Sequence, residues 1–154
     1  MASIVLAPTP NTQEEAVGQV FVSFDVSNAA DVDRMEDREL GPADVRRTAL
    51  DDVLMDSGAT HLCLPADVIA RLGLRFSFEA PVEIPTGTTT RRVFRNARVT
   101  YEDRFAIVSA VELPVGRPPL LGAIPMEELG IEPDLRNRRV RKLPMDMNSS
   151  FLRA

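Results

Sequence analysis

The strongest chemical signal in this sequence is a carboxylate placed directly after an apolar run. Residues 53–60 read Val-Leu-Met-Asp-Ser-Gly-Ala-Thr, so that Asp56 follows three residues of the buried type. A carboxylate is costly to hold there unless hydrogen bonds satisfy it or a reaction uses it. Gly58 permits a tight turn whose backbone N–H groups point back at the carboxylate, and the Ser57 hydroxyl can tie the turn to its surroundings. We therefore expect a rigid loop that presents one carboxylate at the end of a strand.

Two other groupings could carry chemistry, and for each a structural role is favoured. His61 and Cys63 are two positions apart, which places them on one side of a strand, and a Cys–His nucleophile pair is conceivable. Strand neighbours seldom have the geometry for proton transfer, so we expect Cys63 to be a small core residue and His61 to face a groove or solvent. Asp51 and Asp52 could join Asp56 in a metal site, but carboxylates without a fixed spacing are a weak signal, and a solvated strand edge is favoured.

Two further patterns have ordinary explanations. A cluster of arginines near the carboxyl end could bind an acidic partner, although such clusters are usually only solvated. Its members are Arg136, Arg138, Arg139 and Arg141. Residues 56–60 also resemble the phosphate loops of actin-like ATPases, in which glycine lets backbone N–H groups reach phosphate. Those folds need two large domains and a second phosphate loop, and this sequence offers neither.

The size and charge of the chain limit its function class. Its 154 residues suit a single domain with a core of its own, and 44% hydrophobic with 27% charged residues is typical of a soluble globular protein. The formal net charge of -5 leaves no basic surplus to neutralise phosphates, so we expect no nucleic-acid partner.

The single cysteine and single histidine exclude further classes. Cys63 has no second cysteine to pair with inside the chain, so nothing calls for an oxidising compartment. One cysteine and one histidine fall short of the four ligands of a structural zinc site, and no metal is expected. Residues 1–10 do not resemble a signal peptide, and no apolar run approaches the roughly 20 residues of a membrane-spanning helix. We therefore expect a cytoplasmic protein without a membrane partner.

Hydrophobic periodicity predicts a single, mainly β domain over residues 18–144. Alternating apolar and polar residues mark strands with one buried face, and turn-forming residues recur about every ten positions. The strands we expect lie at residues 19–26, 45–55, 61–64, 81–84, 91–95, 97–101, 105–113, 120–122 and, as a last pair, within 132–143. Residues 85–88, Pro-Thr-Gly-Thr, form the tip of one predicted hairpin, and residues 102–104 form the tip of the next. Such a pattern favours a compact β-barrel.

Proline and glycine punctuation predicts two short helices. Pro65 suits the first position of a helix over residues 65–72, and Gly73 suits the left-handed position after its last turn. A second short helix over residues 126–129 is stopped by Gly130.

Three segments are expected to lack regular structure. Residues 28–44 are rich in charged residues and are predicted to form a solvated loop, with room for a helical turn. Residues 1–17 carry no clear period, and we expect a flexible extension there. Residues 145–154 are predicted to be a loose tail.

The loop at Asp56 is similar to the Asp-Thr/Ser-Gly-Ala loop of the retropepsins, the retroviral-type aspartic proteases. In that family apolar residues precede the aspartate, and a second apolar-apolar-Gly motif followed by a helix lies downstream. Residues 120–122, Leu-Leu-Gly, and residues 124–129 match that order here. The hairpin with its tip at residues 85–88 lies where the family has its substrate-covering flap. The resemblance covers about residues 18–144, and the helix at 65–72 is similar to that of the bacterial branch.

This resemblance implies a closed acid-protease β-barrel with two short helices, which acts as an aspartic endopeptidase on peptide or protein substrates. That chemistry needs two carboxylates about 3 Å apart that share one proton. One carboxylate activates water as a general base, and the other donates a proton to the scissile carbonyl. The chain has one such loop, so the second Asp56 must come from another copy in a two-fold homodimer. No cofactor is implied, because activated water is the nucleophile.

The resemblance also assigns roles around Asp56. Ser57 would brace the paired loops, and the Gly58 N–H would steady the carboxylate. Thr86 and Gly87 at the flap tip are candidates to bond the backbone of an extended substrate. The chain departs from the family in having Ser57 for the commoner threonine and a flap tip with less glycine. Ala59 cannot donate a hydrogen bond to the carboxylate, so we expect activity nearer neutral pH than that of pepsin.

Two alternatives to a self-sufficient protease stay open at this point. One is a catalytically silent module of the retropepsin fold that dimerises or binds peptides. The other is a subunit that needs a different partner protein to complete its dyad. Ile84, Val111 and Leu113 are candidate pocket residues, and their apolar side chains suggest apolar residues around the cut site.

Overall fold

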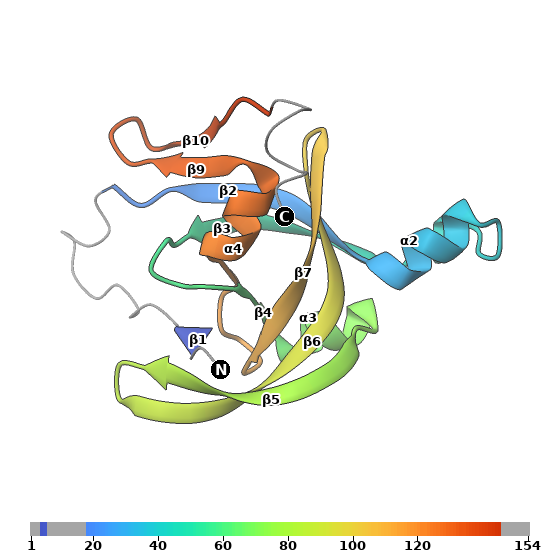
Figure 1. Ribbon diagram of the computed structural model, residues 1–154, viewed down its shortest axis with the longest axis horizontal. Helices are drawn as coiled ribbons and strands as arrows, with labels where there is room; N and C mark the ends of the chain where they lie inside the picture. The colour runs from blue at the N-terminus through green and yellow to red at the C-terminus, as the bar shows by residue number, and fades with distance from the viewer. Residues whose placement is uncertain (1–3, 6–17, 146–154) are drawn as a thin grey trace.

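Strand pairing runs through most of residues 4–5 and 18–145, which are the part of the chain that this computed structural model describes (Figure 1). Within that part, eight strands form one sheet in the order β1-β5-β6-β2-β3-β8-β4-β7, and β6 also pairs with β7. A separate pair, β9 and β10, is antiparallel. The strands are β1 Ile4–Val5, β2 Phe21–Asn28, β3 Arg47–Met55, β4 Leu62–Pro65, β5 Arg75–Ile84, β6 Gly87–Tyr101, β7 Arg104–Leu113, β8 Leu120–Leu121, β9 Ile131–Asp134 and β10 Arg139–Lys142. The predicted mainly β class is confirmed.

Alternation along β2 shows how the pattern of residues sets the inner face of the sheet. Val22, Phe24 and Val26 are buried, and the residues between them are exposed or half-buried. Because successive side chains of a strand point to opposite faces, this register buries one face against the core. β2 runs antiparallel to both β3 and β6, which places it in the middle of the sheet.

Strand β6 is longer than the sequence predicts. The sequence predicts two strands, at residues 91–95 and 97–101, whereas Gly87–Tyr101 is one strand that pairs with β5, β2 and β7. Asn96 has a left-handed backbone with φ of 66°, and the register with β7 shifts between Phe94 and Ala97. Asparagine tolerates that conformation, so a bulge forms where a break was expected and the strand continues.

The two predicted short helices are present, and a third was missed. α3, Ala66–Leu72, ends at Gly73 with φ of 62°, and α4, Ala123–Leu129, ends at Gly130 with φ of 65°. α2, Ala29–Glu36, occupies part of the region predicted as a solvated loop. No helix among the described residues is long and apolar enough to cross a membrane.

Helix α2 forms because its first turn is capped, although its composition is that of a loop. The Asn28 side chain accepts a hydrogen bond from the backbone N–H of Asp31 at 3.1 Å, which satisfies one of the free donors at the helix start. Only Ala29, Asp31 and Val32 of the helix are buried, so the apolar stripe is too narrow to stand out in the sequence. A 3-10 turn, Pro42–Asp44, follows before β3.

The buried apolar side chains of the described residues form two clusters. The larger contains residues of β2, β3, β4, β6, β7, β8, β9, α3 and α4, among them Val26, Val53 and Leu121. The smaller, called the flap-side cluster below, includes a residue of β1. Its buried members are Ile4, Cys63, Ala80, Val82, Val93, Val111 and Leu113, with Ile84 and Leu120 packed against it.

The predicted irregular ends of the chain lie mostly outside the described residues. Of residues 1–17 only Ile4 and Val5 are described, and they form β1. Of residues 145–154 only Met145 is described.

An ion pair between the buried Asp31 and the half-exposed side chain of Arg46 ties α2 to the start of β3. The Asp31 carboxylate is 3% exposed and accepts three hydrogen bonds from Arg46, from the backbone N–H at 3.0 Å, Nε at 2.8 Å and Nη2 at 2.9 Å. The side-chain hydrogen bonds from Arg46 are the main reason that the pKa of Asp31 lies below its usual value of 3.8. A lowered pKa stabilises the fold above pH 3.8, and that stabilisation is lost as the pH falls through the folded-state pKa.

We predict that Asp31→Asn lowers the free energy of unfolding at pH 7 by about 2 kcal/mol, because charge-assisted hydrogen bonds are lost in a buried site. The difference from wild type should shrink as the pH falls below 3.8 and through the lowered folded-state pKa, because the wild-type carboxylate then becomes protonated. Urea unfolding, measured at pH 7 and at a series of acidic pH values, checks this. Asp33→Asn, at an exposed position of the same helix, is the matched control and should change stability by less than about 0.5 kcal/mol.

Candidate active site

Strand β3 carries Asp56 to the point where three strands meet. β3 pairs in parallel with β8, with Met55 opposite Leu121, and the Asp56 N–H extends this pairing by donating to the Leu121 carbonyl at 2.9 Å. β4 pairs with the other side of β8, with Leu62 opposite Leu121. The loop at residues 56–61 therefore joins two strands that flank the same short strand, and both of its ends are fixed.

The loop folds back on its own carboxylate as the sequence predicts. The Gly58 N–H donates to Asp56 Oδ1 at 2.9 Å, and the Ala59 N–H donates to the Asp56 carbonyl at 3.1 Å. Asp56 is half-buried, Ser57 and Gly58 are exposed, and Ala59 is completely buried. One end of the turn is thus anchored in the core while the carboxylate stays within reach of solvent.

A second set of hydrogen bonds locks the loop to the start of α4. The Gly122 N–H donates to the His61 carbonyl at 3.1 Å, and the Ala123 N–H donates to the Ala59 carbonyl at 2.8 Å. A Cβ at Gly122 would lie 2.6 Å from the His61 carbonyl oxygen and 2.8 Å from that of Ala59. Only glycine permits this close approach of two backbones, which gives the Leu-Leu-Gly motif a physical meaning.

The other predicted site residues lie on a separate element. Thr86 and Gly87 are exposed at the tip of the β5–β6 hairpin, where Ile84 pairs with Gly87 across a two-residue turn. Gly87 has φ of 136°, a conformation that favours glycine. Within residues 4–5 and 18–145, no hydrogen bond joins this tip directly to the loop at Asp56.

Strand β1 connects the loop to the hairpin, and it is not predicted by the sequence pattern. The Thr60 N–H donates to the Val5 carbonyl at 3.2 Å, and the Val5 N–H donates to Thr60 Oγ1 at 3.4 Å. On its other side β1 pairs in parallel with β5, with Ile4 opposite Val82. Two adjacent β-branched residues were the only signal, and a run of two is too short to show a period.

His61 and Cys63 do not form a nucleophile pair. Cys63 is completely buried, and its Sγ donates to the backbone carbonyl of His61 at 3.6 Å. Burial, together with the negative charge of Asp56, raises the pKa of Cys63 to about 12, so its thiol is protonated at neutral pH. The Nδ1 atom of His61 lies 2.7 Å from Thr60 Oγ1, and burial lowers the pKa of the imidazole. The predicted role of Cys63 as a core residue is confirmed.

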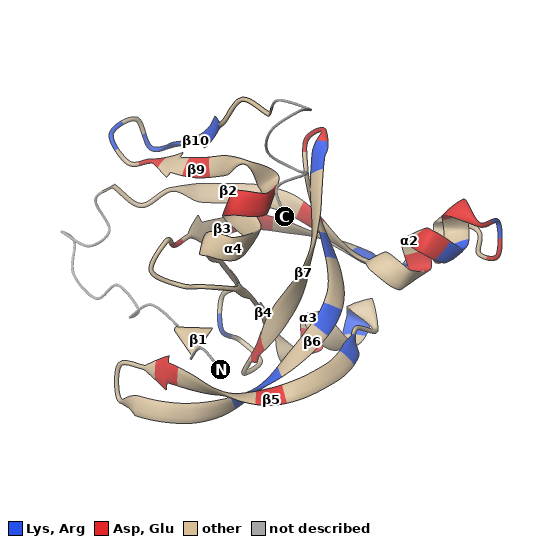
Figure 2. Cartoon of the chain, in the orientation of Figure 1, with Lys and Arg blue, Asp and Glu red and all other residues tan. Residues whose placement is uncertain are grey.

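The remaining charged groupings are surface features. Asp51 and Asp52 are both exposed on β3. Among the described residues, no three His, Cys, Asp or Glu side chains are arranged to hold a metal ion. Figure 2 shows the arginine cluster along the β9–β10 hairpin. There Arg139 lies 3.7 Å from Asp134 and Arg141 lies 3.1 Å from Glu132, so part of the cluster is neutralised by its own hairpin.

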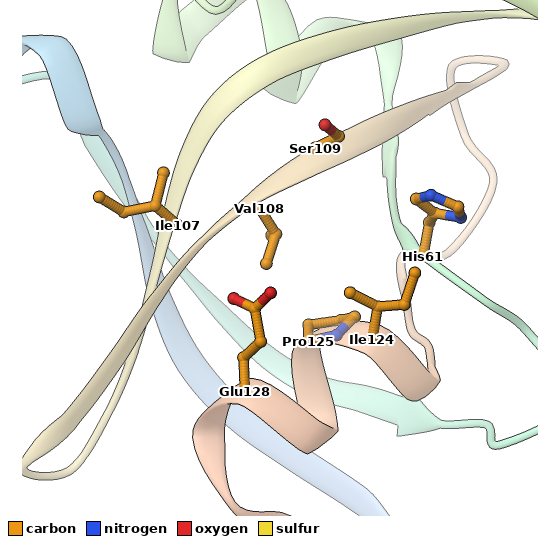
Figure 3. A pocket seen from close by; sticks show the side chains of 7 residues that line it. All are labelled: His61, Ile107, Val108, Ser109, Ile124, Pro125 and Glu128. Atoms are coloured by element: carbon orange, nitrogen blue, oxygen red, sulfur yellow. The ribbon is translucent and has the colours of Figure 1, made fainter. Parts of the chain in front are cut away.

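A hollow of about 280 Å³ lies beside the loop, between β7 and α4 (Figure 3). It is lined by His61, Ile107, Val108, Ser109, Ile124, Pro125 and Glu128. His61 is its only lining residue from the loop, and Asp56 does not line it. The hollow is therefore a neighbour of the candidate catalytic carboxylate and does not contain it.

Comparison with known proteins assigns no family to this chain. No protein-family model matches it, and no curated protein has significant sequence similarity to it. Its function is therefore inferred from the residues and their arrangement.

We predict that Gly122→Ala destabilises the protein by at least about 2 kcal/mol, because the new Cβ meets backbone atoms that cannot move aside without breaking the hydrogen bonds of the loop. Chemical denaturation measures the effect. Gly41→Ala is the matched control: its backbone has φ of -71° and its nearest contact is the Asp44 side chain at 3.2 Å. An alanine there should change stability by less than about 1 kcal/mol. Equal losses in the two variants would contradict the close-approach argument.

Proposed function

We propose that this chain is one subunit of a homodimeric aspartic endopeptidase of the retropepsin type, in which the Asp56 carboxylates of two copies activate water together. One observation carries the proposal above all others. Asp56 stands in a tight loop whose ends are held by the Leu-Leu-Gly segment at residues 120–122, and its carboxylate is only half-buried. A rigid, accessible carboxylate is what shared-dyad catalysis requires of each subunit.

The strand pairings support the acid-protease barrel that the resemblance implies. In the order β6-β2-β3-β8-β4-β7 each strand pairs with the next, and β7 pairs again with β6. Such a cycle of neighbours is the connectivity that a closed barrel needs. β5 and β1 continue the sheet beyond β6, outside that cycle, and β5 supplies one strand of the proposed flap.

The mechanism follows from the hydrogen bonds that Asp56 already has. The Gly58 N–H binds Oδ1, which leaves Oδ2 to face water and the carboxyl group of the other subunit. With one proton shared by the pair, the ionised carboxylate takes a proton from water while the protonated one donates to the scissile carbonyl oxygen. Collapse of the resulting tetrahedral diol, with proton transfer to the nitrogen, breaks the peptide bond.

A second subunit is part of this proposal because the chain supplies one loop of the required type. Ser57 and Gly58 are exposed in the loop. The same loop of a second copy, related by a two-fold axis, can therefore approach them without a change of fold. The Ser57 hydroxyls would then brace the paired loops. Thr86 and Gly87, exposed at the hairpin tip, would donate and accept hydrogen bonds along an extended substrate.

One observation also favours the alternative of a peptide-binding module without turnover. The loop and β5 together hold an extended segment, β1, by strand pairing with β5 and by hydrogen bonds to Thr60. Binding of that kind needs no reaction at Asp56. The two functions are therefore separated by whether a bound peptide is cut.

We predict that the wild-type dimer cuts members of a diverse peptide library and that Asp56→Asn, at unchanged mass and fold, does not. Mixing equal amounts of the two proteins under conditions of subunit exchange should give about a quarter of the activity of the same total amount of wild type, because only dimers with two Asp56 residues are active. Mass spectrometry of the library and light scattering of the proteins provide the readouts. Asp51→Asn, at an exposed position of β3, is the control that should cut as wild type does.

Three outcomes would contradict this proposal in different ways. Cleavage by a strict monomer would exclude the shared dyad. A stable dimer without cleavage anywhere from about pH 3 to pH 8 would favour the peptide-binding module. Activity that falls only to half on mixing would mean that each Asp56 works alone.

We predict that kcat/KM is largest nearer neutral pH than the acidic optimum of pepsin-like enzymes. Ala59, three residues after Asp56 in the same turn, is completely buried and has no hydroxyl that could donate to the carboxylate. A profile of kcat/KM against pH, measured on a peptide from the library, checks this. A maximum at about pH 3 would contradict it.

A further inference from the structure

The two residues of β1 lie between the candidate catalytic loop and a strand of the proposed flap. Figure 1 shows this short strand beside β5, near the hairpin. Val5 exchanges hydrogen bonds with Thr60, which is four positions after Asp56 in the same loop. Val5 also pairs with Glu83, which lies just before the hairpin tip at Thr86. β1 is thus held on one side by the loop and on the other by the flap.

The backbone groups that bind β1 are those that an extended peptide would use to reach Asp56. A peptide in extended form gains affinity by adding a strand to an open sheet edge. The edge of β5 beside Val82 and the N–H of Thr60 are two such partners, and both are engaged by β1. A substrate running between loop and flap would meet these groups already occupied.

The side chain of Ile4 fills an apolar pocket in the same place. It is 4% exposed and belongs to the flap-side cluster, together with Val111 and Leu113. Ile84, at the end of β5, packs against the same cluster. These three neighbours are the residues that the sequence suggested as the lining of a substrate pocket. A branched apolar side chain is therefore what the pocket accepts.

We propose that this groove is a binding site for an extended peptide with a branched apolar side chain, and that the chain's own Ile4–Val5 segment occupies it and competes with substrate. The tether between Val5 and Gly18 is short, so the segment competes at an effective concentration of about millimolar. The apparent dissociation constant of an external peptide rises in inverse proportion to the fraction of molecules whose groove is open. Peptide binding in this groove does not depend on catalysis at Asp56, whereas the effect on cleavage rests on the proposed function.

The test uses a fluorescent peptide with the sequence of residues 1–8, Met-Ala-Ser-Ile-Val-Leu-Ala-Pro, and a control peptide with aspartate in place of its isoleucine. Ile4→Asp should open the groove and bind the first peptide at least about tenfold more tightly than wild type, because its own segment no longer competes. The control peptide should not bind. Val115→Asp, at a residue that is 69% exposed, is the matched control protein and should bind as wild type does.

Two additional proteins keep the result interpretable. Removal of residues 1–5 opens the groove without adding a charge, and it replaces Ile4→Asp should that variant fail to fold by circular dichroism. Combining Ile4→Asp with Asp56→Asn gives a protein that should bind the peptide at the same affinity without cutting it. On a cleavable library peptide, the open variants should show KM lowered about tenfold with kcat unchanged.

The outcomes separate this inference from the proposed protease. Tighter peptide binding to the open variants without cleavage by any protein would uphold the groove and overturn the protease. If wild type and the open variants cleave with the same KM and bind the peptide with equal affinity, the protease proposal is supported. The proposal that residues 4–5 compete with substrate is then contradicted. Equal binding of the isoleucine and aspartate peptides would overturn the apolar pocket.

Discussion

The structure depends on the contact between Gly122 and the backbone of residues 59–61. At that point two segments from distant parts of the chain approach more closely than any side chain would allow. The contact positions β8 between β3 and β4, starts α4 against the loop, and holds the turn that carries Asp56. Because protein interiors are closely packed, the two backbones cannot move apart to admit a side chain at residue 122. Backbone geometry therefore sets the position of the carboxylate.

Much of the fold was predictable because its signals are local. Alternation marked β2, and glycines in the left-handed conformation marked the ends of α3 and α4. The loop at Asp56 was predictable for the same reason, since its turn is made by its own residues. Helix α2 was not predicted, because its stability comes from the Asn28 cap and from the Asp31–Arg46 pair. Neither contact is visible in the hydrophobic periodicity.

The parts that were missed depend on tertiary contacts. Strand β1 forms because Thr60 and Val82, which are far away in sequence, pair with it on its two sides. The sequence of residues 1–17 contains no pattern that indicates these partners. The continuity of β6 through Asn96 is a similar case, since three different strands keep it extended. The residues that could carry chemistry were thus easier to find than the strand that pairs with Thr60.

The parallel pairing of β3 with β8 also has a consequence for folding during synthesis of the chain. The hydrogen bond from Asp56 to Leu121 closes a long loop, and contacts of such high sequence separation form late because chain entropy must be lost first. A ribosome-bound chain that lacks residues 120–124 has no partner for the loop and cannot fix the carboxylate. The position of the Asp56 carboxylate is therefore fixed only once most of the domain has been synthesised.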